Sequence, residues 1–486
     1  MSERNLAKNT VYYTLGLATQ KALSFVYFIF VARMLGVENQ GKYSFALTFT
    51  TVFAILLDFG ITNILIREAA RNKEDSQKYL ANAVTLKLLG SLLIYLVIVV
   101  AVNLMGYPEI TKNMVYVSGL VMILDSFALS FFGIIRGHQN LRFESISVVI
   151  NQLIVLGVGL YALYSHWSLV ALVAVYLFGS GFNVLFSWLS LKFKYRIKVK
   201  ISFDKKIVLN IIKWSLPFAV AGIFSRIYSA MDIILLSKMS GDRSVGIYSV
   251  AYKVAFALQF VALAFSASIY PAFCNYFAHS KKKLSQLFVK SMYWLIVLAL
   301  PLSLGLIAIA DKVVVPVFGA QYLESILPLQ ILMASLLFIF ICFPIGALLN
   351  ASNRQTRNTI NLGIVAAVNT VLNACLIPLW DYNGAAIANL LSYVLLFTLG
   401  ISLVGRIVDY DKKFLLWSLL KILIAGIIMA LVVILLKGYL NFIAVIIIGM
   451  AVYGLLAYLL KIVSPQSIKE FTKDFFNKKS LPAEDV

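Results

Sequence analysis

Several charged side chains lie inside long apolar runs of the chain, and their types suit them to binding or coupling chemistry. Lys21 lies twelve residues before Arg33, about 18 Å along a helix and thus near the middle of a membrane. Arg226 lies 205 residues after Lys21, at the same depth in another apolar run. A central charge costs roughly 2.5–3.5 kcal/mol on insertion scales, so it usually faces a bundle interior or an aqueous cavity. The two cations are therefore predicted to hold an anion between them. The alternative is that each pairs with a carboxylate or extends to the membrane surface.

Carboxylates in the apolar runs are candidates for coupling or gating. Asp232 and Lys253 lie at similar depth on adjacent runs and are predicted to form an ion pair. This pair could have a structural or gating role, or it could couple transport to a cation or proton. Lys253 is also the second place to seek an anion site. Asp125, near the middle of its run, is the better candidate for a functional carboxylate. Asp58, near the inner end of its run, could cap a helix or meet Arg67.

The sequence does not indicate disulfide, metal, histidine-based or nucleotide-binding chemistry. The three cysteines form no CxxC pair, and the three histidines are scattered, so neither a disulfide framework, a metal site nor a histidine triad is predicted. The segment Gly36–Lys42 has the spacing GxxxxGK, but Tyr43 follows where a phosphate-binding loop needs Ser or Thr. We expect no cofactor, no catalytic residue and no enzymatic activity.

Composition places the chain in a membrane. Hydrophobic residues make up 61% and charged residues 13%, with a mean hydropathy of +0.90, which excludes an ordinary soluble enzyme. Lys and Arg number 42 against 21 Asp and Glu. This excess needs no nucleic-acid partner, because membrane orientation explains it.

Fourteen apolar segments are each long enough to cross the bilayer as a helix, and none alternates as a barrel strand would. They are predicted at residues 11–32, 43–60, 80–104, 114–135, 144–163, 168–191, 213–236, 245–271, 286–310, 325–349, 359–378, 384–404, 414–436 and 441–461.

Positive charge predicts the orientation of these segments. An even number of segments puts both termini on one side of the membrane. The loops and termini on that side contain 31 Lys and Arg residues, including Lys87 in the loop between the second and third segments. The other side has 7. The positive-inside rule therefore predicts cytoplasmic termini in the cell (inner) membrane.

An internal repeat divides the chain. Residues 32–46 and 237–251 align without a gap at an offset of 205, with six of 15 positions identical. The glycines shared by the two copies are predicted to shape a tight turn between helices in both halves. Six segments separate the copies, so both halves have the same orientation. The predicted domains are a six-helix lobe at 1–200, a second at 201–405, two extra helices at 406–463 and a cytoplasmic tail at 464–486. The basic and apolar linker at 192–213 could grip anionic lipids, act as a hinge, or be a solvated loop.

These features resemble the polysaccharide transport family of Wzx-type O-antigen flippases, in the superfamily of multidrug, oligosaccharidyl-lipid and polysaccharide exporters. The resemblance covers about residues 5–460. It is carried by Val31–Gly36 (VARMLG), Gly41–Ala46 (GKYSFA), Asp58–Ile61 (DFGI), Arg67–Arg71 (REAAR), Leu216–Phe218 (LPF), Met231–Leu236 (MDIILL) and Gly246–Ala251 (GIYSVA).

The resemblance implies a flippase that carries an undecaprenyl-diphosphate-linked oligosaccharide from the inner to the outer leaflet by alternating access. Lys21 and Arg226 would hold the diphosphate. Membrane lipids and the lipid-linked glycan are the expected partners, with a polysaccharide polymerase and a chain-length regulator as further candidates. Polar residues that could meet the sugar hydroxyls are Gln20, Ser24, Ser225, Ser229, Asn151 and Gln152.

Two alternatives share this architecture. An ion-coupled multidrug extruder would want carboxylates and aromatic residues at its site, and a cationic site argues against it. A flippase of the peptidoglycan precursor lipid II would carry another headgroup.

Overall fold

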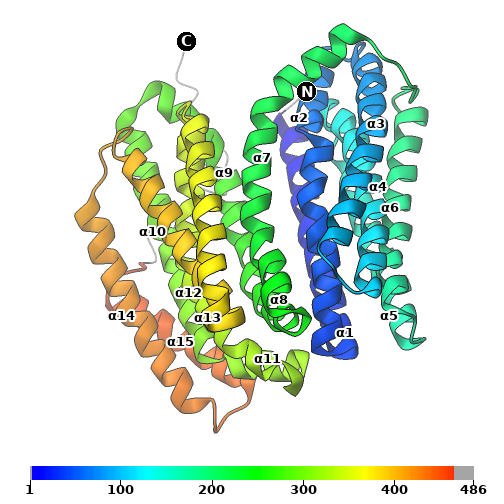
Figure 1. Ribbon diagram of the computed structural model, residues 1–486. Helices are drawn as coiled ribbons and strands as arrows, with labels where there is room; N and C mark the ends of the chain where they lie inside the picture. Colours follow the sequence, from blue (N-terminus) through cyan, green and yellow to red (C-terminus); the bar gives the residue numbers. More distant parts are fainter. Residues whose placement is uncertain (1–2, 465–486) are drawn as a thin grey trace. The chain divides into compact units, whose positions relative to one another are not determined.

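The computed structural model describes residues 3–464, with side chains from residue 12 onward. This part of the chain is nearly all helical and contains no strand, which confirms the predicted all-α class (Figure 1). In chain order the elements are α1 (Glu3–Asp58), α2 (Ile61–Arg71), α3 (Ser76–Leu104), α4 (Glu109–Gly137), α5 (Arg142–Tyr164), α6 (Leu169–Phe193), α7 (Lys205–Ser240), α8 (Asp242–Ala257), α9 (Gln259–His279), α10 (Lys281–Ala308), α11 (Ala310–Phe318), the 3-10 helix η1 (Ala320–Ser325), α12 (Ile326–Ala351), α13 (Gln355–Val404), α14 (Lys412–Leu436) and α15 (Phe442–Leu459).

Twelve helical stretches of the described chain are long and apolar enough to cross a membrane. Two of them each contain two predicted segments, because the backbone breaks without ending the helix. The break in α1 is at Gly36 (φ 75°, ψ 171°), and the break in α13 is at Asp381 (φ 51°, ψ −133°). The fourteen predicted segments therefore all fall in helices of a multi-pass membrane protein.

Polar residues set where several helices begin. Asp204 accepts hydrogen bonds from two backbone amides at the start of α7, at 2.9 and 3.2 Å. Ser168, Ser280 and Asp411 each accept one in the first turns of α6, α10 and α14. Such caps satisfy backbone donors that a helix start leaves free, so they fix the residue at which each helix begins.

The chain divides into two compact units by packing. The first contains the described residues up to Val250 together with Asn369–Ala385, and the second contains Ala251–Val368 and the described residues from Ala386 onward. The predicted domain boundaries at 200 and 405 rest on the repeat and stay predictions. The predicted tail lies outside the described residues from position 465 onward.

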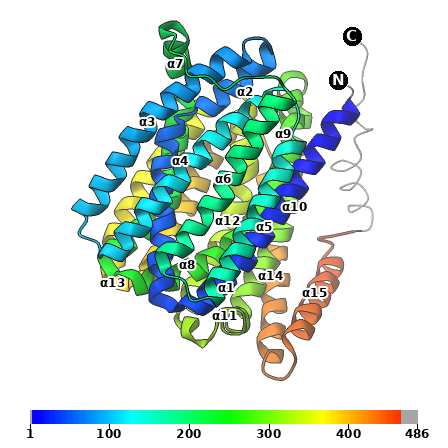
Figure 2. The same cartoon turned by 90° about the vertical axis from the view of Figure 1, so that its right-hand side faces the viewer.

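The first unit is a bundle in which α4 packs against α6, α1 against α5, and α5 against α6 (Figure 2). Its core contains fully buried aliphatic residues such as Ile64, Leu65 and Leu80, together with Phe131 and Phe132. Helix α7 joins this unit by packing along the second segment of α1, where Ile55 lies against Gly222.

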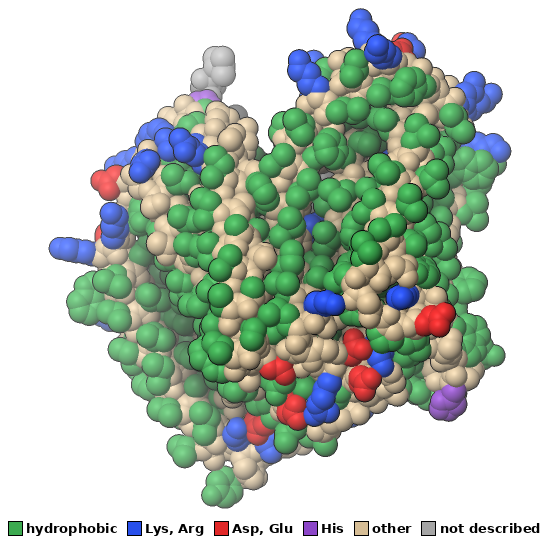
Figure 3. Space-filling model, in the orientation of Figure 1, with side chains coloured by type: hydrophobic (Ala, Val, Ile, Leu, Met, Phe, Trp, Pro, Cys, Tyr) green, Lys and Arg blue, Asp and Glu red, His purple; other side chains and the backbone are tan. Residues whose placement is uncertain are grey.

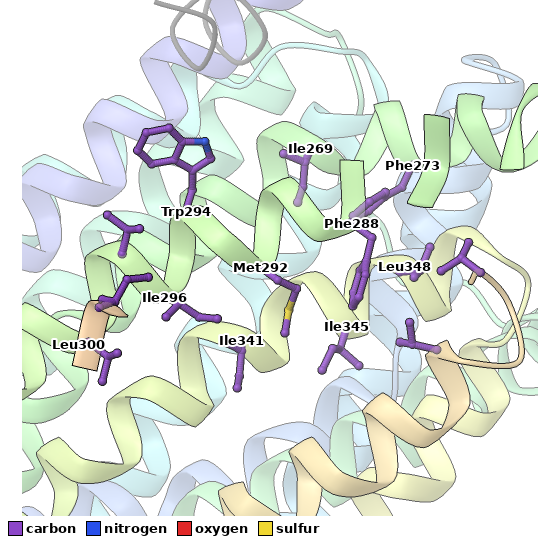
Figure 4. Packing of buried hydrophobic residues seen from close by; sticks show 14 of the residues in the cluster. Ile269, Phe273, Phe288, Met292, Trp294, Ile296, Leu300, Ile341, Ile345 and Leu348 are labelled. Atoms are coloured by element: carbon purple, nitrogen blue, oxygen red, sulfur yellow. The ribbon is translucent and has the colours of Figure 1, made fainter. Parts of the chain in front are cut away.

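The second unit packs α10 between α12 and α14, and α15 against α14. Phe288 and Met292 of α10 meet Ile341 and Ile345 of α12 in its core (Figure 4). The two extra C-terminal helices are thus part of this packed unit, because Ile422 and neighbouring residues of α14 join the same cluster.

The internal repeat extends to the backbone. Gly36 and Gly241 are 205 residues apart, which is the offset of the repeat. Both adopt a backbone conformation that only glycine takes readily. The φ and ψ angles are 75° and 171° at Gly36, and 84° and −176° at Gly241. Both end a long apolar helix and begin the next segment. The two glycines therefore make the same sharp turn in each half, as the sequence predicts.

Gly41 and Gly246 have a different role from the predicted shaping of a turn. A methyl group on Gly41 would lie 1.7 Å from the carbonyl oxygen of Asp242, and one on Gly246 would lie 1.9 Å from that of Val37. Val37 and Asp242 are also related by the offset of 205. The two turns of the repeat therefore contact each other reciprocally, backbone against backbone, and only glycine permits this approach.

Candidate functional site

Lys21 and Arg226 occupy equivalent positions on α1 and α7. Each lies fifteen residues before the glycine that ends its apolar segment, Gly36 or Gly241, which is about 22 Å along a helix. Both side chains are exposed. The structure therefore places the two cations at equal distances from two identical backbone turns.

Within the described part of the chain, neither the Lys21 ammonium nor the Arg226 guanidinium has a carboxylate partner or a side-chain hydrogen bond. The alternative that each pairs with a carboxylate therefore has no support among the described contacts of the first unit, and the anion-binding role stays a prediction. An unpaired cation in an apolar helix is unfavourable unless water or an anion solvates it. These two residues are thus suited to bind an anionic ligand.

The polar residues predicted beside them fall into three pairs. Gln20 donates to the Gln152 side chain at 3.2 Å, which ties α1 to α5. Ser225 and Ser229 are exposed beside Arg226, and the Ser229 hydroxyl donates to the Arg226 carbonyl oxygen at 3.1 Å. Two further residues, Ser24 and Asn151, are half-buried. The serines on α7 are therefore exposed on the same helix as Arg226.

Asp58 has a buried partner, Lys87. The predicted placement of Lys87 in a loop is wrong, because this residue lies in α3 with a fully buried side chain. Its ammonium donates to Asp58 at 2.7 Å and to the Ser126 carbonyl oxygen at 2.8 Å. Thr62 also donates to Asp58, at 2.5 Å. These contacts join α1, α2, α3 and α4 and suit Asp58 to a structural role; its predicted gating role stays untested.

Arg67 does not meet Asp58 as the sequence suggested. Its guanidinium bonds to Glu68 at 2.7 Å and lies over the Trp214 ring, 4.5 Å from the centroid. These contacts link α2 to α7. The Asp58 carboxylate therefore depends on Lys87 for its compensating charge.

Asp232 lies in a buried polar cluster of the first unit. It accepts hydrogen bonds from the Tyr248 hydroxyl and the Asn373 side chain, both at 2.7 Å. Asn373 also donates to the carbonyl oxygen of Asn369 at 2.9 Å. The two asparagines are not among the predicted site residues, although a polar pair four residues apart in an apolar segment is a signal visible in the sequence.

Two further predicted residues are placed as follows. Asp125, on α4, lies close to the Ser180 hydroxyl of α6. Lys253 is half-buried on the part of α8 that belongs to the second unit, so its predicted pairing with Asp232 stays a prediction. No group of three or more His, Cys, Asp or Glu residues in the described chain could hold a metal ion.

Comparison with known proteins gives a family match. The family described as "Polysaccharide biosynthesis protein" matches residues 6–277, which is more than half of the chain. The probable low-salt glycan biosynthesis flippase Agl15 of Haloferax volcanii is 23% identical over 391 residues, covering 80% of this chain and 81% of that protein. The capsular polysaccharide biosynthesis protein CapF of Staphylococcus aureus is 22% identical and covers 79% of this chain and 95% of its own length.

A solved structure shows the same fold. It is that of a lipid II flippase, MurJ, in an inward closed conformation. It has a TM-score of 0.78 to this chain at 16% identity, and covers 96% of this chain and 99% of its own. At this identity the likeness concerns the fold alone.

Proposed function

Because the chain belongs to the polysaccharide biosynthesis protein family, we propose that it is a flippase for an undecaprenyl-diphosphate-linked oligosaccharide. It would move this cargo from the inner to the outer leaflet of the cell membrane by alternating access, with both termini in the cytoplasm. The observation that carries the proposal is the equivalent placement of Lys21 and Arg226, two exposed cations for which the described chain supplies no carboxylate.

The proposed site binds the diphosphate through charge. Lysine offers a compact positive charge, and arginine can bind two phosphate oxygens at once. Ser225 and Ser229, which are exposed on the same helix as Arg226, would meet the first sugar. Binding an anion removes the repulsion between the two cations, so it favours the states in which both contact the cargo.

The energy for export need not come from a nucleotide. A diphosphate carries roughly two negative charges, and each gains about 2.3 kcal/mol per 100 mV on moving outward through an inside-negative potential. The potential alone could therefore favour export. Asp125 and Asp232 are the proposed coupling or gating residues if a cation contributes. A polysaccharide polymerase and a chain-length regulator would act on the exported cargo.

Substitution of the two cations tests the site. We expect Lys21→Ala or Arg226→Ala to lower glycan export by about ten- to a hundredfold, because a charge-assisted hydrogen bond contributes about 1.5–3 kcal/mol. Lys21→Arg should retain more export than Lys21→Gln, and Arg226→Glu should be worse than Arg226→Ala. Export is measured as surface polysaccharide in cells that depend on this chain.

Lys421→Ala is the matched control, because Lys421 is another exposed lysine within a membrane helix, α14. It should leave export nearly unchanged, and all variants should reach the membrane at similar levels. Near-normal export by both alanine variants would show that the pair does not bind the cargo. The diphosphate site would then be sought first at Lys253.

Lipid II is a second candidate cargo, because the lipid II flippase MurJ of Bacillus subtilis is 20% identical over 491 residues and covers 90% of this chain. Rescue of cells that lack a lipid II flippase, without rescue of glycan export, would favour this cargo. A multidrug extruder fits less well, because exposed cations would repel cationic drugs.

A further inference from the structure

The linker between α6 and α7 is fastened along α3. Three side chains of α3 form hydrogen bonds with the backbone of this linker. Gln77 accepts from the Lys198 amide at 3.3 Å, and Asn82 accepts from the Asp204 amide at 2.6 Å. Thr85 accepts from the Ser202 amide at 3.0 Å and donates to the Ser202 carbonyl oxygen at 2.9 Å. These bonds satisfy backbone groups that have no helix or strand partner. The segment is therefore a fixed surface feature of the first unit and is not a free linker.

The fastened segment turns its basic side chains outward. Ile197 is 7% exposed and Val199 is half-buried, whereas Arg196, Lys198 and Lys200 are exposed. From Ile197 to Lys200 buried and exposed side chains alternate, as in an extended chain whose successive side chains point to opposite sides. Arg196 comes directly before this stretch, at a left-handed turn of the backbone (φ 55°). Three positive charges are therefore exposed along the fastened segment.

Large apolar side chains are exposed beside these charges. Phe193 is 71% exposed, Ile201 is 73% exposed and Phe203 is 62% exposed. Figure 3 shows lysine and arginine side chains among hydrophobic ones at the end of the first unit where α7 begins, at the upper right. Water is a poor solvent for the apolar groups, and hydrocarbon is a poor solvent for the charges. The zone of lipid headgroups accommodates both.

We propose that this linker surface, formed by Phe193, Arg196, Lys198, Lys200, Ile201 and Phe203, binds the headgroups of anionic phospholipids. The basic groups would contact lipid phosphates, while the apolar groups enter the outer part of the acyl region. Each Lys or Arg near an anionic membrane surface contributes about 1 kcal/mol. Because α3 already holds the segment in place, little ordering entropy opposes binding. The surface is separate from Lys21 and Arg226, and does not depend on the identity of the cargo.

The test measures lipid affinity directly. The purified full chain in neutral detergent is titrated with fluorescent phosphatidylglycerol and, separately, with fluorescent phosphatidylcholine. We expect tighter binding of phosphatidylglycerol. The triple variant Arg196→Gln, Lys198→Gln, Lys200→Gln should bind phosphatidylglycerol about a hundredfold more weakly, since three charges are removed. The charge-retaining variant Lys198→Arg, Lys200→Arg should bind like the original chain.

Two controls separate the surface from general charge and from free phosphate. Lys281→Gln, Lys282→Gln and Lys283→Gln remove three exposed lysines from the second unit and should leave the high-affinity binding in place. Inorganic phosphate should not displace phosphatidylglycerol, because it lacks the acyl chains. Equal affinity for the two lipids, equal losses in the two triple variants, or displacement by phosphate would each overturn the proposal.

Discussion

Intramembrane charges of this chain are of two physical kinds. Lys21 and Arg226 are exposed and lack a carboxylate in the described chain, whereas Asp58 and Lys87 are buried and paired. A buried pair is held by mutual attraction in a medium of low dielectric constant, and removing one partner leaves a charge that nothing compensates. Exposed cations instead remain available for a ligand. Similar residue types in similar apolar runs therefore serve structure in one case and are proposed to serve binding in the other.

The buried pair gives a prediction for stability. Lys87→Met should destabilise the protein by about 3–5 kcal/mol, because the Asp58 carboxylate loses its partner. The double variant Asp58→Asn, Lys87→Met should recover much of this loss, since neither charge remains. Thermal unfolding in detergent measures both effects.

Lys78→Met is the matched control on the same helix. Lys78 is 71% exposed and lies 3.5 Å from Asp75, so its loss should change stability by less than about 1 kcal/mol. If Lys87→Met were as mild as Lys78→Met, the pair would not hold the first unit together.

At the level of the elements, the reciprocal contact of Gly41 and Gly246 brings the backbones of the two copies of the repeat together. A methyl group at either position would lie within 2 Å of a carbonyl oxygen, which no side chain can do without moving the backbone. Gly41→Ala and Gly246→Ala should therefore separate the two turns. We expect each variant to reduce export strongly, because it disfavours a state in which the turns touch.

Cross-linking measures this separation. In a chain whose three cysteines are replaced by serine, Lys42→Cys and Asp242→Cys should form a disulfide faster with Gly41 present than with Gly41→Ala. Gly157→Ala is the control on α5, because a methyl group there would meet nothing within 4 Å. Unchanged cross-linking and export in Gly41→Ala would show that the contact is dispensable.

At the scale of the whole molecule, orientation in the membrane is the property that the charge distribution predicts. With Lys87 moved from a loop into a buried pair, one side still holds about thirty Lys and Arg against 7, so the predicted orientation is unaffected. Single cysteines at Ser165 and Lys282, both exposed, should report opposite sides. A membrane-impermeant reagent added outside intact cells should label position 165 and not position 282. The reverse result would invert the topology and the proposed direction of transport.

Much of the architecture follows from local properties of the sequence. Apolar length predicts the helical segments, since a membrane helix must satisfy its own backbone and needs about twenty apolar residues. The 205-residue repeat predicts that Gly36 and Gly241 are equivalent, and both make the same turn. The position of Lys21 and Arg226 in their helices follows from the same repeat. None of these inferences requires knowledge of which segments pack together.

Only the tertiary structure decides which charges and glycines meet. Asp58 and Lys87 are 29 residues apart, and their pairing depends on how α1 packs against α3. The Asp232 cluster joins residues 141 positions apart, from α7 and α13. Likewise, Gly41 looks like a turn former in sequence, yet its role is to let a distant backbone approach. Hydropathy and spacing describe one segment at a time, whereas the partner of a buried polar group is set by packing between segments.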